Sequence, residues 1–228
     1  MTVPANNLCA LLLTTLMGCC TTTRPPLSEQ NYPGTLLPPT QLATEAVWRQ
    51  RVTATWHPTG QGPQERGFDA ALQRQGEALT VIGLSPLGSV GFSIQQTRSG
   101  IDVVNNIEDQ LVIPPQFILL DVQRAFFPWP CQDWSLQNRD GTRTGHVAGE
   151  EVVETWHDGR LQSRTFRRLD EQPAGLITVT YEWQQPSWAL PSRAVLNNAW
   201  FGYQLTITTS SETLLTPSAQ AEVSEAAS

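Results

Sequence analysis

Apolar and polar residues alternate along much of the chain. In residues 47–56, one face carries Trp48, Gln50, Val52, Ala54 and Trp56, and the other carries Arg and Thr. A period of two residues is typical of a strand with one buried face. The same period recurs in short segments separated by glycine-containing turns, which predicts an antiparallel meander. Its further strands are expected at residues 66–73, 78–84, 89–95 and 101–105.

The alternation stops at Pro114 and Pro115, and prolines favour the first turn of a helix. Apolar residues with helical spacing follow: Ile118, Val122, Ala125 and Phe126. Only a narrow polar strip remains: Asp121, Gln123 and Arg124. A helix that is apolar over most of its circumference must be covered on several sides. We therefore expect residues 115–127 to lie against the concave face of the sheet and to border a cavity.

Strands resume in the second half of the chain. Residues 151–157 and 160–169 flank Asp158-Gly159, a strong signal for a hairpin turn. Three more strands are expected at residues 175–183, 192–197 and 200–208. After Ser210 the composition is mostly Ser, Ala, Thr and Glu, which indicates a disordered tail.

The first residues follow a different pattern. An apolar run ends in Leu16-Met17-Gly18-Cys19 and is shorter than the ~20 residues of a membrane-spanning helix. This run resembles a bacterial lipoprotein signal peptide, which implies cleavage before Cys19 and acylation of that residue. Because Cys20 follows instead of Asp, the usual inner-membrane retention mark in enteric-type bacteria, the resemblance implies the periplasmic face of the outer membrane. The alternative interpretation is a short buried helix.

These patterns divide the chain into four parts. They are a signal peptide (1–18), a lipidated cysteine with a flexible Thr- and Pro-rich tether (19–44), a folded domain (45–210) and a disordered tail (211–228). The net charge of −7 and the pI of about 4.9 argue against nucleic-acid binding and against docking on anionic lipid. All 14 basic residues are Arg. Three of them, Arg164, Arg167 and Arg168, are interpreted as a solvated strand face.

Residues with catalytic or metal-binding chemistry are scattered. The three histidines, His57, His146 and His157, have no partner at metal-ligand spacing, so neither a metal site nor a cofactor is expected. Glu150 and Glu151 would lie on opposite faces of a strand, which makes them a poor acid–base pair. No Gly-x-Ser-x-Gly elbow occurs, and no catalytic residue is expected.

Three further residues leave alternatives open. Asp121 is interpreted as a surface residue or as the partner of Arg124. Cys20 and Cys131 have the chemistry for one disulfide in an oxidising periplasm. We favour no disulfide, because Cys20 lies in the tether.

The arrangement of tether, strands, apolar helix and further strands resembles the LolA/LolB group of periplasmic lipoprotein carriers and acceptors. It is also similar to an uncharacterised family of outer-membrane lipoproteins often encoded beside aryl-polyene synthesis genes. The resemblance rests on Phe117-Ile118-Leu119-Leu120-Asp121-Val122-Gln123, on Trp129-Pro130, and on Asn197-Asn198 to Gly202-Tyr203-Gln204-Leu205. It implies a mainly β (α+β) fold: one large antiparallel sheet curled into an open half-barrel, with one or two helices plugging its concave face.

The function implied by this resemblance is binding of acyl chains in an apolar hollow. We expect a lipid-anchored periplasmic protein that binds or transfers an amphiphile, such as lipoprotein acyl chains, a glycolipid or a polyene-lipid. The candidate cavity residues are Phe92, Phe117, Leu120, Phe126, Phe127 and Trp129. The alternative is a non-catalytic docking partner of an envelope export or biosynthesis complex. A thioesterase or glycosidase ranks third.

Overall fold

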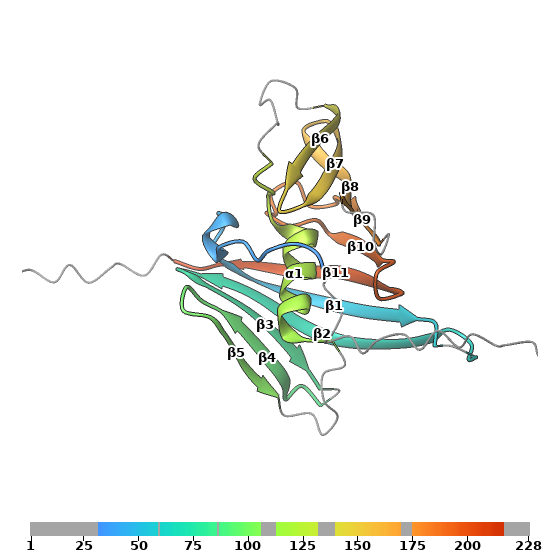
Figure 1. The fold of residues 1–228 in the computed structure, drawn as a ribbon. Coiled ribbons are helices and arrows are strands. Elements are labelled where there is room, and N and C mark those ends of the chain that lie inside the picture. Colours follow the sequence, from blue (N-terminus) through green and yellow to red (C-terminus); the bar gives the residue numbers. More distant parts are fainter. Residues whose placement is uncertain are drawn as a thin grey trace, which may run out of the picture.

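The computed structural model describes residues 32–58, 60–85, 87–105, 113–131, 140–169 and 175–216. These residues form one eleven-stranded antiparallel sheet and one α-helix (Figure 1). The first five strands are β1 (Ala46–Trp56), β2 (Gln64–Gln75), β3 (Ala78–Leu84), β4 (Val90–Gln96) and β5 (Ile101–Asn105). The other six are β6 (Gly141–Val147), β7 (Glu150–His157), β8 (Arg160–Arg168), β9 (Leu176–Glu182), β10 (Arg193–Asn198) and β11 (Tyr203–Leu214).

The sheet consists of two meanders joined in the middle. Its strand order is β5-β4-β3-β2-β1-β11-β10-β9-β8-β7-β6. Each strand lies beside its neighbour in sequence, except that β5 and β6 form the two edges and β1 pairs with β11. The predicted large antiparallel sheet is therefore confirmed, and β1 and β11 form its centre.

The alternation of β1 is the one expected from the sequence. Trp48 is fully buried and Val52 is buried, whereas Arg49 and Arg51 are exposed. The predicted hairpin at Asp158-Gly159 is also confirmed, with φ of 51° and 68°. Positive φ at both central residues gives a turn whose twist matches that of the flanking strands.

Two strand predictions need correction. β11 continues to Leu214, six residues past its predicted end, because it pairs with β1 as far as Ala46. The strand therefore occupies the start of the predicted tail. β6 was not predicted, because its sequence, GTRTGHV, contains a single large apolar residue. It pairs with β7 along its whole length and forms an edge of the sheet.

The helix α1 (Pro115–Phe126) matches its prediction closely. Pro115 occupies its first turn, and the chain becomes extended at Phe127, directly before Pro128. Figure 1 shows α1 crossing in front of β11, β1 and β2. Leu119 and Phe127 are completely buried, so the helix closes the hydrophobic core over the middle of the sheet.

Residues 32–42, here named the strap, lie over the inner face next to α1. Composition predicted a flexible tether as far as residue 44, but Tyr32, Leu37 and Leu42 are buried in the core. A short 3-10 helix, η2 (Pro39–Gln41), lies within the strap and contacts β3. Large apolar residues placed among the prolines give the strap enough buried surface to pack. The second half of the predicted tether is thus part of the folded domain.

Several predictions fall outside the described residues. They are the signal peptide, Cys19, the start of the tether with Cys20, and the tail from residue 217. Cys131 is half-buried, and its pairing with Cys20 stays untested. In the described part of the chain, no helix has the length and apolar character needed to span a bilayer.

Candidate functional site

The inner face of the sheet can be followed strand by strand from the register. Trp56 lies opposite Tyr203, Ala54 opposite Leu205, and Val52 opposite both Ile207 and Phe68. The hydroxyl group of Tyr203 donates a hydrogen bond to Asp121 of α1. The residues in this row therefore point toward the helix and form the inner face of the sheet. Across β1, β2 and β11 the inner face is therefore largely apolar.

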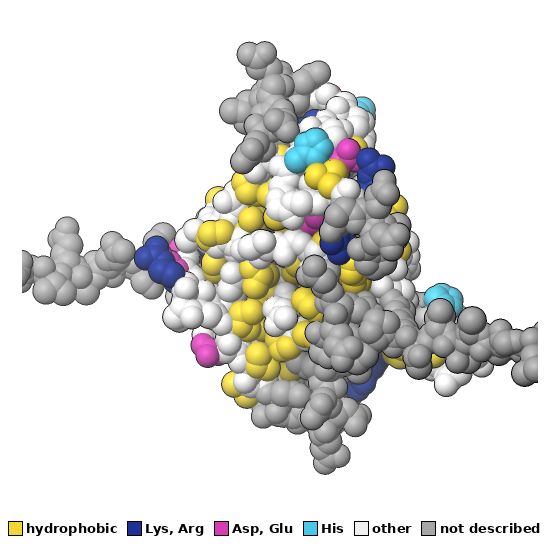
Figure 2. Space-filling model, viewed as in Figure 1, with side chains coloured by type: hydrophobic (Ala, Val, Ile, Leu, Met, Phe, Trp, Pro, Cys, Tyr) yellow, Lys and Arg dark blue, Asp and Glu magenta, His cyan; other side chains and the backbone are white. Residues whose placement is uncertain are grey.

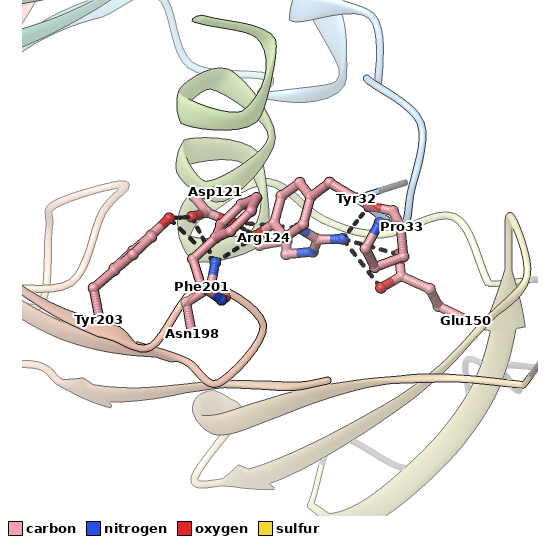
Figure 3. A network of polar contacts seen from close by, with 8 residues as sticks. All are labelled: Tyr32, Pro33, Asp121, Arg124, Glu150, Asn198, Phe201 and Tyr203. Carbon is pink, nitrogen blue, oxygen red and sulfur yellow. Dashed lines mark hydrogen bonds and ion pairs between the residues drawn. The ribbon is translucent and has the colours of Figure 1, made fainter. Parts of the chain in front are cut away.

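The side of α1 that faces the sheet is polar at its centre. Asp121 accepts hydrogen bonds from the hydroxyl groups of Tyr32 and Tyr203 and from Asn198 Nδ2, the last at 3.2 Å (Figure 3). Its side chain is only 3% exposed. The strap, α1, β10 and β11 thus meet at one carboxylate.

Arg124 continues this cluster on the next turn of α1. Its Nη1 lies 3.3 Å from Asp121 Oδ1, and its Nη2 lies 3.0 Å from Glu150 Oε1. Nη2 also donates to the carbonyl oxygen of Pro33 in the strap, at 2.6 Å (Figure 3). The guanidinium is fully buried, and its carbon lies 4.7 Å from the centre of the Tyr32 ring. We name these residues the central polar cluster: Tyr32, Asp121, Arg124, Glu150, Asn198 and Tyr203.

The cluster decides between the two interpretations of Asp121 that the sequence left open. Asp121 is the partner of Arg124, as one alternative held, and it is not a surface residue. The polar strip of α1 points into the protein because its charges find partners there. The carboxylates of Asp121 and Glu150 both contact Arg124. Both are buried, and both are engaged in hydrogen bonds with its guanidinium.

Burial changes the ionisation of several groups in the cluster. Burial and the nearby Asp121 charge raise the pKa of Tyr32 and Tyr203 well above 10. Burial raises the pKa of Glu150, although the charge of Arg124 opposes this shift. Burial lowers the pKa of Arg124, but the interactions with Tyr32, Glu150 and Asp121 outweigh it and raise the pKa. The cluster therefore holds a permanent buried cation between two acidic side chains.

A second set of charges lies on the inner face of β6, β7 and β8. Glu154 is fully buried between Arg164, at 2.6 Å, and Arg143, at 2.6 Å. Arg164 also donates to the carbonyl oxygen of Arg124 at the end of α1, at 2.8 Å. Arg164 was interpreted as part of a solvated face, but it is buried, while Arg167 is exposed and pairs with Glu151. Residues 164 and 167 point in opposite directions because they are three positions apart on a strand, and side chains alternate between its faces.

Gln123 fastens the strap to α1 on another side of the helix. Its Oε1 accepts from the amide of Leu37 at 2.7 Å, and its Nε2 donates to the carbonyl of Leu37 at 2.9 Å. Nε2 also donates to Gln96 Oε1 on β4, at 2.8 Å, and Gln96 donates in turn to the Leu37 carbonyl. One strap residue is thus held by two buried glutamines from α1 and the sheet.

Toward the end of β1 at Trp56 and the start of β11 at Tyr203, part of the apolar inner face is less covered. We name it the inner apolar patch: Ala54, Trp56, Phe68 and Leu205. Trp56 is 36% exposed, and Phe68 and Leu205 are half-buried against the core. The patch is continuous with the core, so an apolar molecule could extend the same surface.

The structure distributes the six candidate cavity residues over two environments. Phe92 is buried and lies 6.2 Å from Phe68 of the inner apolar patch between ring centres, whereas Phe117 is half-buried against Tyr32 and Phe201. The other four are buried in the core near α1: Leu120, Phe126, Phe127 and Trp129. Contact of any of them with a ligand remains a prediction.

Two adjoining hollows are found elsewhere, at the β2–β3 and β4–β5 turns. They measure about 540 and 440 Å³, and both are lined by Glu77, Thr97 and Arg98. Strap residues Leu36 and Pro38 line the second one. Neither contains a candidate cavity residue. Their lining includes an exposed Arg98–Glu77 ion pair, so they are open surface features.

Other side chains with metal-binding or acid–base chemistry are solvent-exposed or separated. Asp140, His157 and Asp158 place ligand atoms within 4.8 Å of one another, but all three are exposed. His157 and Asp158 lie at the β7–β8 turn, and Asp140 directly precedes β6. Glu150 and Glu151 lie on opposite faces, as expected: Glu150 is buried, and Glu151 is half-buried. Among the described residues, Asp140, His157 and Asp158 are therefore interpreted as an exposed polar group on the surface.

Sequence reasoning missed most partners of the central polar cluster. Tyr32 lay within the predicted tether, and Asn198 lies 77 residues from the Asp121 that it contacts. One usable signal was present, because an Asp and an Arg three residues apart interrupt an otherwise apolar helix. Such a pair in a covered helix implies buried partners elsewhere in the chain.

Comparison with known families places this chain. The family described as "Protein of unknown function (DUF3261)" matches residues 47–211, so the chain belongs to this family. No curated protein matches the sequence.

Solved structures similar to this one include three bacterial proteins. A LolA superfamily protein from Nitrosomonas europaea is 11% identical, with a TM-score of 0.43 over 79% of this chain and 95% of that one. A putative outer membrane lipoprotein-sorting protein domain from Vibrio parahaemolyticus is 11% identical, with a TM-score of 0.40, over 76% and 86%. The Mycobacterium tuberculosis lipoprotein LppX is 13% identical, with a TM-score of 0.31, over 78% and 97%. The predicted membership of an uncharacterised family is thereby confirmed. The predicted mainly β fold, one large antiparallel sheet with a helix, is confirmed by the structure itself.

Proposed function

We propose that this protein is an outer-membrane lipoprotein that binds or transfers an amphiphile on the inner face of its sheet, without catalysing a reaction. The observation that carries the proposal is the polar inner side of α1. Asp121, Gln123 and Arg124 are all buried where the helix covers an apolar sheet. A polar contact face of this kind suits a helix that moves away from the sheet.

The argument rests on what exposure to water costs each kind of contact. An apolar helix face loses about 25 cal/mol for each Å² that it exposes. Polar and charged groups exchange their protein partners for water, and a buried ion pair adds little net stability compared with apolar packing. Lifting α1 and the strap therefore costs less than lifting an apolar helix of the same size.

An acyl chain would gain from the surface that this movement uncovers. The inner apolar patch already extends the core past α1, and each methylene buried there contributes ~0.8 kcal/mol. Phe92 borders the patch, and Phe117, Leu120, Phe126, Phe127 and Trp129 would contact the chain once α1 has moved. The hydrophobic effect supplies the affinity, so no catalytic group is required.

The anchoring part of the proposal concerns Cys19. Acylation at this residue would hold the domain at the periplasmic face of the outer membrane, and two or three chains are needed because one gives only marginal binding. Labelling with a palmitate analogue tests it: the parent protein should incorporate label, and Cys19→Ala should not. Label in the Cys19→Ala variant would refute the anchor.

Ligand binding is tested by native mass spectrometry of the protein purified from its host. We expect a co-purifying lipid, or an adduct after addition of a long-chain lipid. An outer-surface variant, Asp69→Asn, which breaks the exposed ion pair with Arg51, serves as the control and should bind equally. Consistent failure of the parent protein to bind any lipid would refute the amphiphile proposal.

A second candidate function is docking on an envelope protein. It is favoured by the filled core under α1 and by apolar residues on the outer side of the helix. Ile118 and Val122, with Leu36 of the strap, are half-buried, and Figure 2 shows hydrophobic side chains gathered over this region. Cross-linking in the host envelope, lost in Ile118→Asp but retained in Gln116→Asp, would support docking.

A further inference from the structure

Two polar side chains face each other across the centre of the sheet, on its inner face. Gln50 of β1 lies opposite Thr209 of β11, next to the register shift at Arg49/Gln50. Gln50 is 7% exposed and Thr209 is 5% exposed, whereas the adjacent Arg49, Arg51, Thr208 and Ser210 are all exposed on the other face. Both side chains therefore point toward the core that α1 and the strap cover.

Each side chain has one buried polar atom that lacks a partner within the described part of the protein. Gln50 Nε2 and Thr209 Oγ1 are both buried and have no hydrogen-bond partner there. Elsewhere on this face, buried polar side chains such as Gln96 and Asn198 are paired. A buried donor that lacks a partner destabilises a protein, so a pair of them on neighbouring central strands requires an explanation.

We propose that Gln50 and Thr209 form a subsite for the carbonyl oxygen of an acyl ester or acyl amide. The inference rests on the proposed function and specifies its ligand. An amide N–H and a hydroxyl both donate to a carbonyl, and a carbonyl is the polar atom at the head of an esterified acyl chain. The two donors lie in the inner row that leads through Val52 to the inner apolar patch. The subsite therefore fixes the head of the chain at the centre of the sheet, with the methylenes directed along the apolar row.

The same chain provides a matched control pair on the opposite face. Gln95 of β4 lies opposite Thr80 of β3, and Gln95 Nε2 donates to Thr80 Oγ1 at 3.2 Å. Both residues are half-buried on the outer face. This pair has the same residue types and the same cross-strand arrangement, but its members satisfy each other.

The experiment compares two probes that differ only in the proposed carbonyl. They are glycerol monopalmitate, an ester, and 1-O-hexadecylglycerol, its ether analogue. The parent protein should bind the ester about 25-fold more tightly than the ether, which is about fivefold for each of two hydrogen bonds. Gln50→Leu and the nearly isosteric Thr209→Val should each reduce this preference to about fivefold, whereas Gln95→Leu and Thr80→Val should retain it in full.

Thermal unfolding of the same variants guards against a folding artefact. Gln50→Leu and Thr209→Val remove unsatisfied polar groups, so their melting temperatures should equal or exceed that of the parent protein. If Gln50→Leu fails to fold, Thr209→Val decides. Equal binding of ester and ether by the parent protein would overturn the subsite and leave the proposed function standing. Binding of neither probe would overturn both.

Discussion

Arg124 and Glu150 form an ion pair that solvent does not reach. Arg124 Nη2 lies 3.0 Å from Glu150 Oε1, and the two side chains are 0% and 1% exposed. The pair joins the last turn of α1 to the first residue of β7, 26 residues further along the chain. The position of the helix over the sheet is thus set by a directional polar contact in addition to apolar packing.

Arg124→Met should strongly destabilise the protein. The substitution keeps much of the side-chain volume but leaves Asp121 and Glu150 buried without their cation, which typically costs 3–5 kcal/mol. Chemical denaturation at neutral pH measures the loss. The exposed pair Arg51–Asp69 provides the control, since Arg51→Met should change stability by less than about 1 kcal/mol. A loss equal to that of the control would show that the cluster is not structural.

Glu150 should make stability depend on pH in a defined direction. Burial raises its pKa above the ordinary value of 4.5, so the folded protein binds this proton more tightly than the unfolded chain. The stability that this contributes is complete below pH 4.5 and is lost as pH rises through the folded pKa. Relative to the parent protein, Glu150→Gln should therefore gain stability between pH 4 and pH 7. Glu151→Gln, on the other face, should show no such trend, and an opposite trend in Glu150→Gln would contradict the prediction.

The three tyrosines of the chain should ionise together. Tyr32, Tyr181 and Tyr203 are the whole set, and burial raises the pKa of each, that of Tyr181 to about 12. Each contributes stability that is full below pH 10 and lost as pH rises through its folded pKa. Absorbance of tyrosinate should therefore appear in one cooperative step that coincides with alkaline unfolding by circular dichroism. A tyrosine that titrates near pH 10 in the folded protein would show that its hydroxyl is accessible.

Gln123→Met distinguishes a movable cover from a permanent core. The variant removes three hydrogen bonds that hold Leu37 and Gln96, without altering the inner apolar patch. If α1 and the strap must lift before binding, destabilising the closed state by ~1.4 kcal/mol raises the apparent affinity about tenfold. Titration with a fluorescent fatty acid measures this, and Gln116→Met on the exposed side of α1 is the control. A lower melting temperature with no gain in binding would assign the helix to the core.

Local pattern was enough to predict most strands and the helix. The period of two in β1 and the paired prolines before α1 each follow from one short segment, because burial on one side repeats with the geometry of the element. β6 escaped prediction because an edge strand with seven mostly polar residues carries little apolar signal. The end of β11 depends on its pairing with β1, which lies more than 150 residues earlier.

The site was harder to predict because its residues come from distant segments. The sequence showed that Asp121 and Arg124 share a side of the helix. It left open whether that side was solvent-exposed or buried. Only the fold brings Glu150, Asn198 and the strap to them. Tyr32 was hidden by its setting, since a single aromatic residue among prolines resembles linker composition.

The pairing of β1 with β11 also has a consequence for how the protein reaches its final form. Each meander is built from contacts close in sequence, which form early. The central pairing needs closure of a loop that contains the rest of the domain, and such closure is slow. The two meanders become one sheet only when the last strand is available. A chain that ends before Tyr203 would therefore retain the strands β1 to β5 and β6 to β10, and it would lack β11, the strand that joins the two groups.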